Sequence, residues 1–136
     1  MAKLTVEVVT PEKRLLATQV DEAIVPGTVG LFGVLPGHTA FLSLLDAGPL
    51  TLKDGGTVTQ YFVAGGFAEV ANDQVLILAD QAEPVTNIDV EAASTRLRAA
   101  QEKLKGMTPK EGGRDALLMA VRRETARIAL GRAGKA

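Results

Sequence analysis

The chain has 136 residues, of which 46% are apolar, 23% charged and 4% aromatic, which fits one compact domain or a small domain with an appendage. Fifteen basic and sixteen acidic residues give a formal charge of −1, which excludes a polycation that binds nucleic acid or anionic lipid along its whole length. The absence of cysteine excludes disulfides, thiol catalysis and thiolate zinc sites. The single histidine, His38, excludes metal sites that need two imidazoles.

The first residues enter an alternating strand pattern directly, so we expect no secretory or transit segment and a mature protein that starts here. Residues 23–45 carry no formal charge and would span a bilayer of about 30 Å if they were helical. Pro26, Pro36 and several glycines interrupt this stretch, and irregular backbone facing lipid would leave amides unsatisfied. We therefore expect a soluble protein.

The composition changes near residues 84–87. Twelve of the fourteen valines and all five aromatic residues precede Asn87, whereas seven of the eight arginines follow it. We therefore expect a β domain over residues 1–87 and a helical domain over residues 88–136. Residues 1–87 hold four basic and ten acidic side chains (−6), residues 88–109 hold four and three (+1), and residues 110–136 hold seven and three (+4).

Short runs with period-two alternation recur through the first part, separated by turns rich in Gly, Pro, Asn and Asp. They cover residues 4–8, 20–25, 39–45, 50–52, 57–63, 67–70 and 75–78. Seven or more short strands within about 85 residues predict a small antiparallel sandwich or barrel.

The second part has the periodicity of a helical hairpin. Its first apolar stripe, between an N-cap at Asn87 or Asp89 and a stop at Gly106, comprises Val90, Ala93, Leu97, Ala100 and Leu104. The second stripe comprises Leu117, Leu118, Val121, Thr125 and Ile128. The second helix starts either at the capping box of residues 108–111 or near Arg114, because Gly112 and Gly113 weaken an earlier start.

The two helices are rich in alanine and have no aromatic residue. Each methyl-sized group contributes at most about 0.8 kcal/mol when it is buried. We therefore expect the hairpin to dock weakly on the sandwich, so that a modest competing interaction shifts its population.

The glycine-rich segment 27–37 is not a phosphate-binding loop, because it lacks the lysine and the dinucleotide spacing. We expect a compact surface loop whose glycines supply positive φ. His38 has no nucleophile motif beside it, which favours a turn or packing residue over a general base. Leu31 and Phe32, flanked by glycines in a charge-free loop, indicate a contact surface. The acidic pair Asp21-Glu22 is interpreted as solvated edge residues.

The last predicted helix is cationic through Arg114, Arg122, Arg123, Arg127, Arg132 and Lys135. Three interpretations stay open. The first is a solvated face whose cations the helix dipole favours near the C-terminus, and the second is docking to an acidic protein surface. The third, nucleic acid, is the weakest, because nothing after Asn87 offers an aromatic stacking platform.

Three segments have counterparts in one known family. They are Gly-Leu-Phe-Gly-Val-Leu-Pro-Gly-His at 30–38, Val-Ala-Gly-Gly-Phe-Ala-Glu-Val at 63–70 and Val-Leu-Ile-Leu-Ala-Asp-Gln-Ala-Glu at 75–83. They resemble the Gly-x-x-Gly-(aliphatic)-x-Pro-Gly-His loop, the Ser/Ala-Gly-Gly-x-x-Glu-Val strand pair and the Val-x-(aliphatic)-Leu-Ala-Asp-x-Ala strand of the epsilon subunit of bacterial F-type ATP synthase. Order and spacing also agree, from Leu4 to about Ala129.

The resemblance implies a ten-stranded β-sandwich followed by a helix-turn-helix, without catalytic residues, metal or cofactor. It implies that the sandwich binds the gamma subunit and the c-ring, rotates with the central stalk and couples proton flow to ATP synthesis. The helices of such proteins lie against the sandwich or extend along gamma into the alpha/beta catalytic head. There the basic second helix meets acidic loops of beta and inhibits ATP hydrolysis.

The resemblance also implies site residues at matching positions. Leu31, Phe32 and Gly33 face the c-ring, and His38 approaches gamma. Family members often have an acidic residue at the position of Leu31, so we expect an apolar contact with the ring here. The residues that resemblance assigns to the inhibitory contact are Arg122, Arg123 and Arg127.

Some members of the family sense ATP through a motif Ile/Leu-Asp-x-x-Arg-Ala. Ile88, Asp89 and Ala93 match it here, but Ala92 replaces the arginine. Charge-assisted bonds to a phosphate are lost with that arginine. We therefore expect weak or absent ATP binding.

The implied location is the cytoplasmic face of the bacterial inner membrane, with membrane association only through the complex and no nucleic-acid partner; a plastid origin stays open. Two rival functions belong to other classes. A stand-alone sandwich module with a chaperone-like hairpin would not co-purify with gamma, and a small hydrolase that uses His38 would show turnover by the isolated chain.

Overall fold

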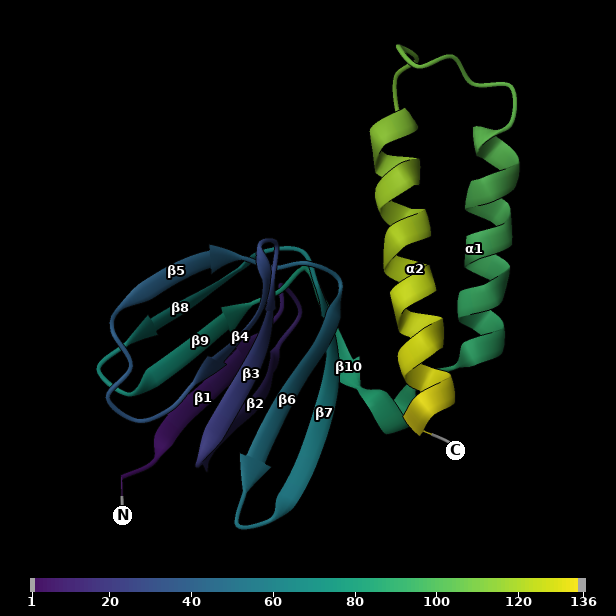
Figure 1. The fold of residues 1–136 in the computed structure, drawn as a ribbon. Coiled ribbons are helices and arrows are strands. Elements are labelled where there is room, and N and C mark those ends of the chain that lie inside the picture. The colour runs from purple at the N-terminus through teal and green to yellow at the C-terminus, as the bar shows by residue number, and fades with distance from the viewer. Residues whose placement is uncertain (1, 135–136) are drawn as a thin grey trace. The chain divides into compact units, whose positions relative to one another are not determined.

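The computed structural model describes residues 2–134. The chain divides into two compact units, Met1–Pro84 and Val85–Ala136. Figure 1 shows the strands of the first unit and the paired helices of the second.

The first unit is a sandwich of two five-stranded sheets. One sheet has the order β2(Arg14–Val20), β1(Leu4–Val9), β9(Gln74–Leu78), β8(Phe67–Ala71), β5(Phe41–Leu44). The other has the order β10(Gln81–Pro84), β7(Thr57–Ala64), β6(Gly48–Asp54), β3(Glu22–Gly27), β4(Gly30–Val34). All pairs are antiparallel except β1 with β9, which is parallel. The predicted sandwich followed by a helical hairpin is confirmed.

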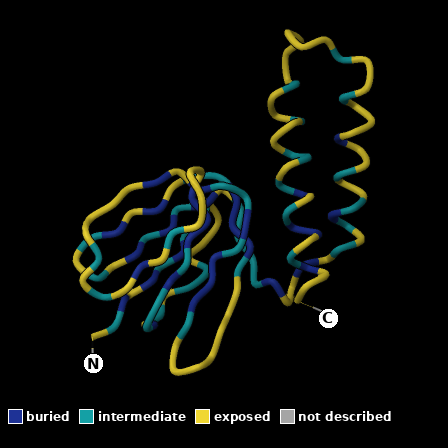
Figure 2. Tube along the Cα trace, in the orientation of Figure 1, coloured by how far each residue is buried: buried dark blue, intermediate teal, exposed yellow. Residues whose placement is uncertain are grey.

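The core lies between the two sheets, because alternate side chains of each strand point inward. In β1, Leu4, Val6 and Val8 are fully buried, and in β6, Leu50 and Leu52 face them from the other sheet. Figure 2 shows the resulting alternation of buried and exposed residues along the strands. The valine-rich pattern of the first part thus supplies one continuous core.

Two strand predictions need correction. The predicted run 20–25 belongs to two strands, since β2 ends at Val20 and β3 begins at Glu22, with Asp21 between them. The segment predicted as a surface loop contains strand β4, which pairs with β3. Gly27 and Gly30 are paired across the turn, and Gly30 has φ +126°, so the glycines close a hairpin.

The second unit begins with the 3-10 helix η1(Val85–Asn87), followed by α1(Val90–Leu104) and α2(Arg114–Gly134). Asp89 is the N-cap of α1, since its side chain accepts a hydrogen bond of 3.0 Å from the Ala92 N–H. Asn87 lies in η1 instead. Gly106 follows the helix with φ +82°, as expected of a stop signal. α2 begins at Arg114, and the earlier start at Thr108 is wrong because residues 108–111 form only a turn.

The buried face of α2 is rotated from the predicted stripe. Leu118 and Thr125 are exposed, whereas the buried residues of α2 are Glu124, Arg127, Ile128 and Gly131. Gly131 lets η1 and the start of α1 approach closely, since a Cβ there would lie 2.7 Å from Ile88 Cγ2. Apolarity alone therefore misplaces this face, because a charged residue and a glycine occupy it.

Candidate docking surfaces

Strand β4 lies at one edge of its sheet and strand β5 at one edge of the other; the opposite edges are β10 and β2. Strands β4 and β5 are joined by an aromatic contact, with the Phe32 and Phe41 rings 5.1 Å apart in an edge-to-face arrangement. The turn before β4 also touches β5, because the Thr28 N–H donates to the Leu44 carbonyl at 3.0 Å. These contacts make β4, β5 and their adjoining turns one continuous surface.

This surface exposes large apolar side chains. On β4 Leu31 is 65% exposed, and on β5 Leu42 and Leu44 are each 64% exposed. We name it the apolar edge; its members are Val29, Leu31, Leu35, Phe41, Leu42, Leu44 and, beside Leu44 on the paired strand β8, Phe67. Clusters of exposed apolar side chains of this kind indicate protein contact sites.

Sequence reasoning missed the contribution of β5. Ser43 is the buried residue of this strand, while Leu42 and Leu44 point outward. The run Phe-Leu-Ser-Leu-Leu at 41–45 contains the signal, because within β5 Ser43 occupies the inward position and Leu42 and Leu44 the outward ones. Such an inversion is unfavourable for a free strand and is expected of one whose outer face meets a partner.

His38 lies in the loop between β4 and β5, which is tied to the adjacent turn between β8 and β9. The Gly37 N–H donates to Asp73 Oδ1 at 2.7 Å, and the His38 N–H donates to the Leu35 carbonyl at 3.0 Å. His38 Nδ1 lies 2.6 Å from the Thr39 carbonyl oxygen, and its ring lies 6.4 Å from that of Phe41. This loop is therefore held beside the apolar edge by Asp73.

The structure brings the four predicted docking residues close to one another along β4 and the loop after it. Leu31 and Gly33 are exposed, whereas His38 is half-buried. Phe32 is half-buried too and packs against the sandwich core, so it supports the surface more than it forms it. Their contacts with a ring or with gamma stay predictions.

Asp21 is not simply a solvated acid. Its Oδ1 lies 2.8 Å from Lys3 Nζ, its Oδ2 accepts from the Gly55 N–H at 2.9 Å, and Lys3 also contacts Asp54. The hydrogen bond from Lys3 and that from Gly55 lower the pKa of Asp21, while the two carboxylates raise the pKa of Lys3. The cluster joins the start of the chain to two turns of the sandwich.

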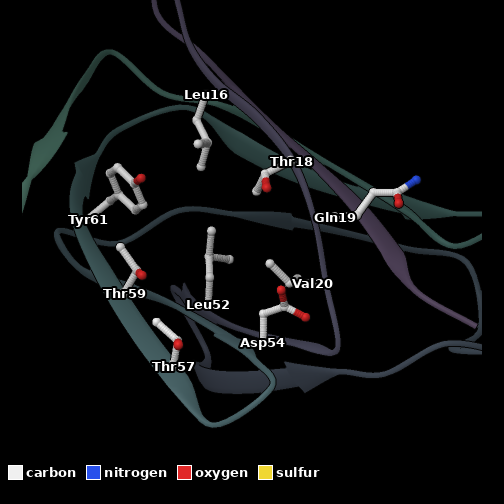
Figure 3. Close-up of a pocket in the computed structure, with 9 residues that line it drawn as sticks. All are labelled: Leu16, Thr18, Gln19, Val20, Leu52, Asp54, Thr57, Thr59 and Tyr61. Atoms are coloured by element: carbon white, nitrogen blue, oxygen red, sulfur yellow. The ribbon is translucent and has the colours of Figure 1, made fainter. Parts of the chain in front are cut away.

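A pocket of about 250 Å³ opens between β2, β6 and β7 (Figure 3). Its polar groups are mainly the hydroxyls of Thr18, Thr57, Thr59 and Tyr61. The one carboxylate that lines it, Asp54, is engaged with Lys3. The pocket offers hydrogen bonds but no nucleophile paired with a base, so it does not have the chemistry of a hydrolytic site.

In the helical unit, basic side chains converge on Glu124. Arg96 Nε on α1 donates to Glu124 Oε1 at 2.9 Å, Arg123 Nε donates to Oε2 at 3.0 Å, and Arg127 Nη1 lies 3.7 Å from Oε1. Arg127 is only 8% exposed, whereas Arg122 is exposed. Arg123 and Arg127, which were predicted to meet a partner, thus already contact a carboxylate within the hairpin. Lys135 lies outside the described residues.

The degenerate ATP motif spans the start of α1. Ile88 is buried against Gly131 of α2, and Ala93 is buried as well. The Asp89 carboxylate serves as the N-cap, and Ala92 supplies the N–H that it accepts. The motif positions thus build the helix start.

The described residues, 2–134, contain no cluster of three or more His, Cys, Asp or Glu side chains that could hold a metal ion. Among the same residues, no helix combines the length and apolarity needed to cross a membrane.

Comparisons with known proteins agree with this architecture. A family model described as the ATP synthase delta/epsilon chain beta-sandwich domain matches residues 3–85. The ATP synthase epsilon chain of Myxococcus xanthus is 62% identical over 128 residues, which cover 94% of this chain and 94% of the relative. That of Anaeromyxobacter dehalogenans strain 2CP-C is 44% identical and covers 92% of this chain and 95% of the relative.

Solved structures show the same fold. A chain in the cryo-EM structure of the Euglena gracilis mitochondrial ATP synthase (OSCP/F1/c-ring) is 27% identical, with a TM-score of 0.81, over 95% of this chain and 81% of that chain. A chain in the Tetrahymena thermophila ATP synthase central stalk and c-ring structure has a TM-score of 0.59 at 16% identity, covering 97% of this chain and 96% of that one, and shows the fold alone.

Proposed function

This chain belongs to the ATP synthase epsilon chain family, and on that premise we propose that it is a non-catalytic rotor subunit of an F-type ATP synthase. In this proposal the sandwich is the rotor-docking domain, over residues 1–87, and binds the gamma subunit and the c-ring. It turns with them and couples proton translocation to ATP synthesis. The helices, over residues 88–136, form the regulatory domain.

The observation that supports docking most directly is the apolar edge. Leu31, Leu42 and Leu44 expose apolar surface on two neighbouring edge strands, which is unfavourable in water unless a partner covers it. Leu31 is suited to an apolar contact with the ring, since it offers no charge. In this proposal His38, whose ring lies 6.4 Å from that of Phe41, approaches gamma. The proposal requires no catalytic side chain, metal or cofactor.

Co-purification tests this docking. We expect Leu31→Ser and Leu44→Ser to lower the yield of gamma and c-ring captured with the chain, because each removes an apolar contact from the interface. The matched control is Val58→Ser, since Val58 is similarly exposed but lies on β7, outside the apolar edge. Unchanged capture by both edge variants would contradict the assignment of this surface.

The proposal for the helices is that they restrain ATP hydrolysis when they extend into the alpha/beta catalytic head. Arg122, Arg123 and Arg127 would then meet acidic loops of beta. The +4 charge of residues 110–136, from seven basic and three acidic side chains, supports such a contact. Truncation after Asn87 tests it, because assembly should survive while ATP hydrolysis by the complex rises.

The proposed location follows from the partners. A chain that binds the c-ring from the cytoplasmic side lies at the bacterial inner membrane as a peripheral subunit, held there by the complex. Membrane fractions from cells that lack gamma should therefore lose this chain to the soluble fraction.

A further inference from the structure

We propose that Glu124 is a carboxylate clasp that holds the helical hairpin closed through Arg96 of α1 and that also pairs with the α2 arginines, Arg123 and Arg127. The closing role rests on the hairpin alone. The link to inhibition rests on the proposed function, in which those arginines meet acidic loops of beta.

The burial of Glu124 is the first step. The residue is 1% exposed and lies on the inner face of α2, between positions that carry apolar side chains. A buried carboxylate is unfavourable unless it is paired and hydrogen-bonded. Glu124 meets this condition through guanidinium groups on both of its oxygens. Its place in the inner face therefore depends on these arginines.

The three arginine contacts of Glu124 differ in whether they need the two helices to be adjacent. Arg123 and Arg127 belong to the same helix as Glu124, at positions i−1 and i+3, so their contacts survive when the helices separate. Arg96 belongs to α1 and reaches Glu124 at 2.9 Å across the hairpin. Of these three arginine contacts, that of Arg96 is the one that requires α1 and α2 to lie side by side.

This difference gives the cluster a preference for one state. In the closed hairpin, neutralising Glu124 removes the charge-assisted hydrogen bond that Arg96 of α1 makes across the hairpin, which raises the free energy of that state. In the open hairpin, the same side chains reach water, so neutralisation costs little there. The substitution therefore shifts the population toward the open hairpin.

The clasp also resembles the proposed contact in chemistry. Glu124 presents to Arg123 and Arg127 the carboxylate that an acidic loop of beta would present. An external carboxylate must compete with this internal one for these guanidiniums in either state, because both contacts lie within α2. Opening breaks the Arg96 contact and separates the basic helix from α1.

Spin labels measure the opening in the full chain. The chain has no cysteine, so Glu91→Cys and Ala133→Cys provide two unique labelling sites. Both residues are exposed; they lie near the start of α1 and the end of α2, at the end of the hairpin away from its loop. Distance distributions between the two labels, measured by double electron–electron resonance, then report the closed and open fractions. We expect E124Q and R96Q each to raise the open fraction at least about fivefold.

Two matched controls separate the clasp from general loss of charge. Arg98 is an exposed arginine on α1, two residues after Arg96. Glu102 is an exposed glutamate that pairs with Lys105, near the end of the same helix. R98Q and E102Q should leave the distance distribution unchanged. Circular dichroism keeps the test falsifiable, because a loss of helix in R96Q would show that the contact supports folding and would overturn the clasp.

The rate of ATP hydrolysis by the assembled complex distinguishes the two proposals. With both correct, E124Q and R96Q lower the rate, because the basic helix reaches the catalytic head more often. An open fraction unchanged by E124Q and R96Q overturns the clasp, whatever the rate does. A raised open fraction with an unchanged rate supports the clasp and overturns the inhibitory function.

Discussion

Lys3 Nζ lies 2.8 Å from Asp21 Oδ1, so the first strand of the sandwich is tied to the turn between β2 and β3. Asp21 also accepts the Gly55 N–H at 2.9 Å, which adds the turn between β6 and β7 to the same cluster. Three segments far apart in sequence are thus joined by one carboxylate, at the end of a sandwich whose interior is apolar.

This cluster predicts a pH dependence of the free energy of unfolding. The pKa of Asp21 is lowered from 3.8, so its contribution is present above that value and is lost as the pH falls through the lower pKa of the folded state. The pKa of Lys3 is raised from 10.5, so its contribution is present below that value and is lost at higher pH. Urea unfolding should show a constant difference between the unmodified chain and D21N from about pH 5 to 9, shrinking below about pH 4.

The control for this experiment is E12Q, because Glu12 is an exposed acid outside the cluster. A difference between D21N and the unmodified chain that persists unchanged at pH 2 would contradict the ion pair as its origin.

We predict that Asp73 stabilises the fold by holding the loop beside the apolar edge. D73A removes the acceptor of the Gly37 N–H and places alanine at φ +60°, so we expect a loss of about 1–3 kcal/mol in the free energy of unfolding. D73N keeps an acceptor and tolerates this φ, and should stay within about 0.5 kcal/mol. Equal losses in both variants would refute the role assigned to the hydrogen bond and the turn.

We predict that the turn between β7 and β8 has no room for a side chain at position 66. A Cβ there would lie 1.8 Å from the Leu78 carbonyl oxygen, and its φ is +88°. G66A should therefore prevent stable folding, since backbone must move. Gly55 also has positive φ, but a Cβ there meets nothing within 4 Å, so G55A should lose only about 1–2 kcal/mol. Comparison of the thermal unfolding temperatures of the two variants separates the effect of backbone strain, which both share, from that of the steric clash, which only G66A has.

The presence of alanine at position 92 leads us to predict that the chain binds ATP weakly or not at all. The Asp89 carboxylate already caps α1 through the Ala92 N–H, and Ala92 has no charge to offer a phosphate. Calorimetry should therefore detect no micromolar binding of ATP to the unmodified chain. A92R should bind ATP measurably more tightly, because it restores the arginine of the motif. Micromolar affinity in the unmodified chain would show that Ala92 is not the deciding residue.

Periodicity and turn residues predicted the parts of the fold that depend on local chemistry. Asp89 as an N-cap and Gly106 as a helix stop follow from the needs of helix ends, and both were among the predicted signals. Strand β4 was missed because glycines that close its hairpin also suit a loop. Short-range patterns do not distinguish these cases.

The candidate surfaces were only partly predictable. Leu31 could be found because it is an apolar residue between glycines, but Leu42 and Leu44 needed the inward position of Ser43 to be known. Glu124 was missed because a charged residue is normally assigned to the solvent face of a helix. Its burial depends on Arg96, which lies 28 residues earlier, and no local pattern reveals that pairing.

The central claim, that the sandwich turns with the rotor through its apolar edge, is tested most directly by cross-linking within a working enzyme. Leu31→Cys in this cysteine-free chain should form a disulfide with a cysteine introduced on the c-ring surface that the account places against it. The account predicts that ATP-driven rotation of single complexes continues after this bond forms. Failure of the bond to form, or rotation that stops when it does, would contradict the account.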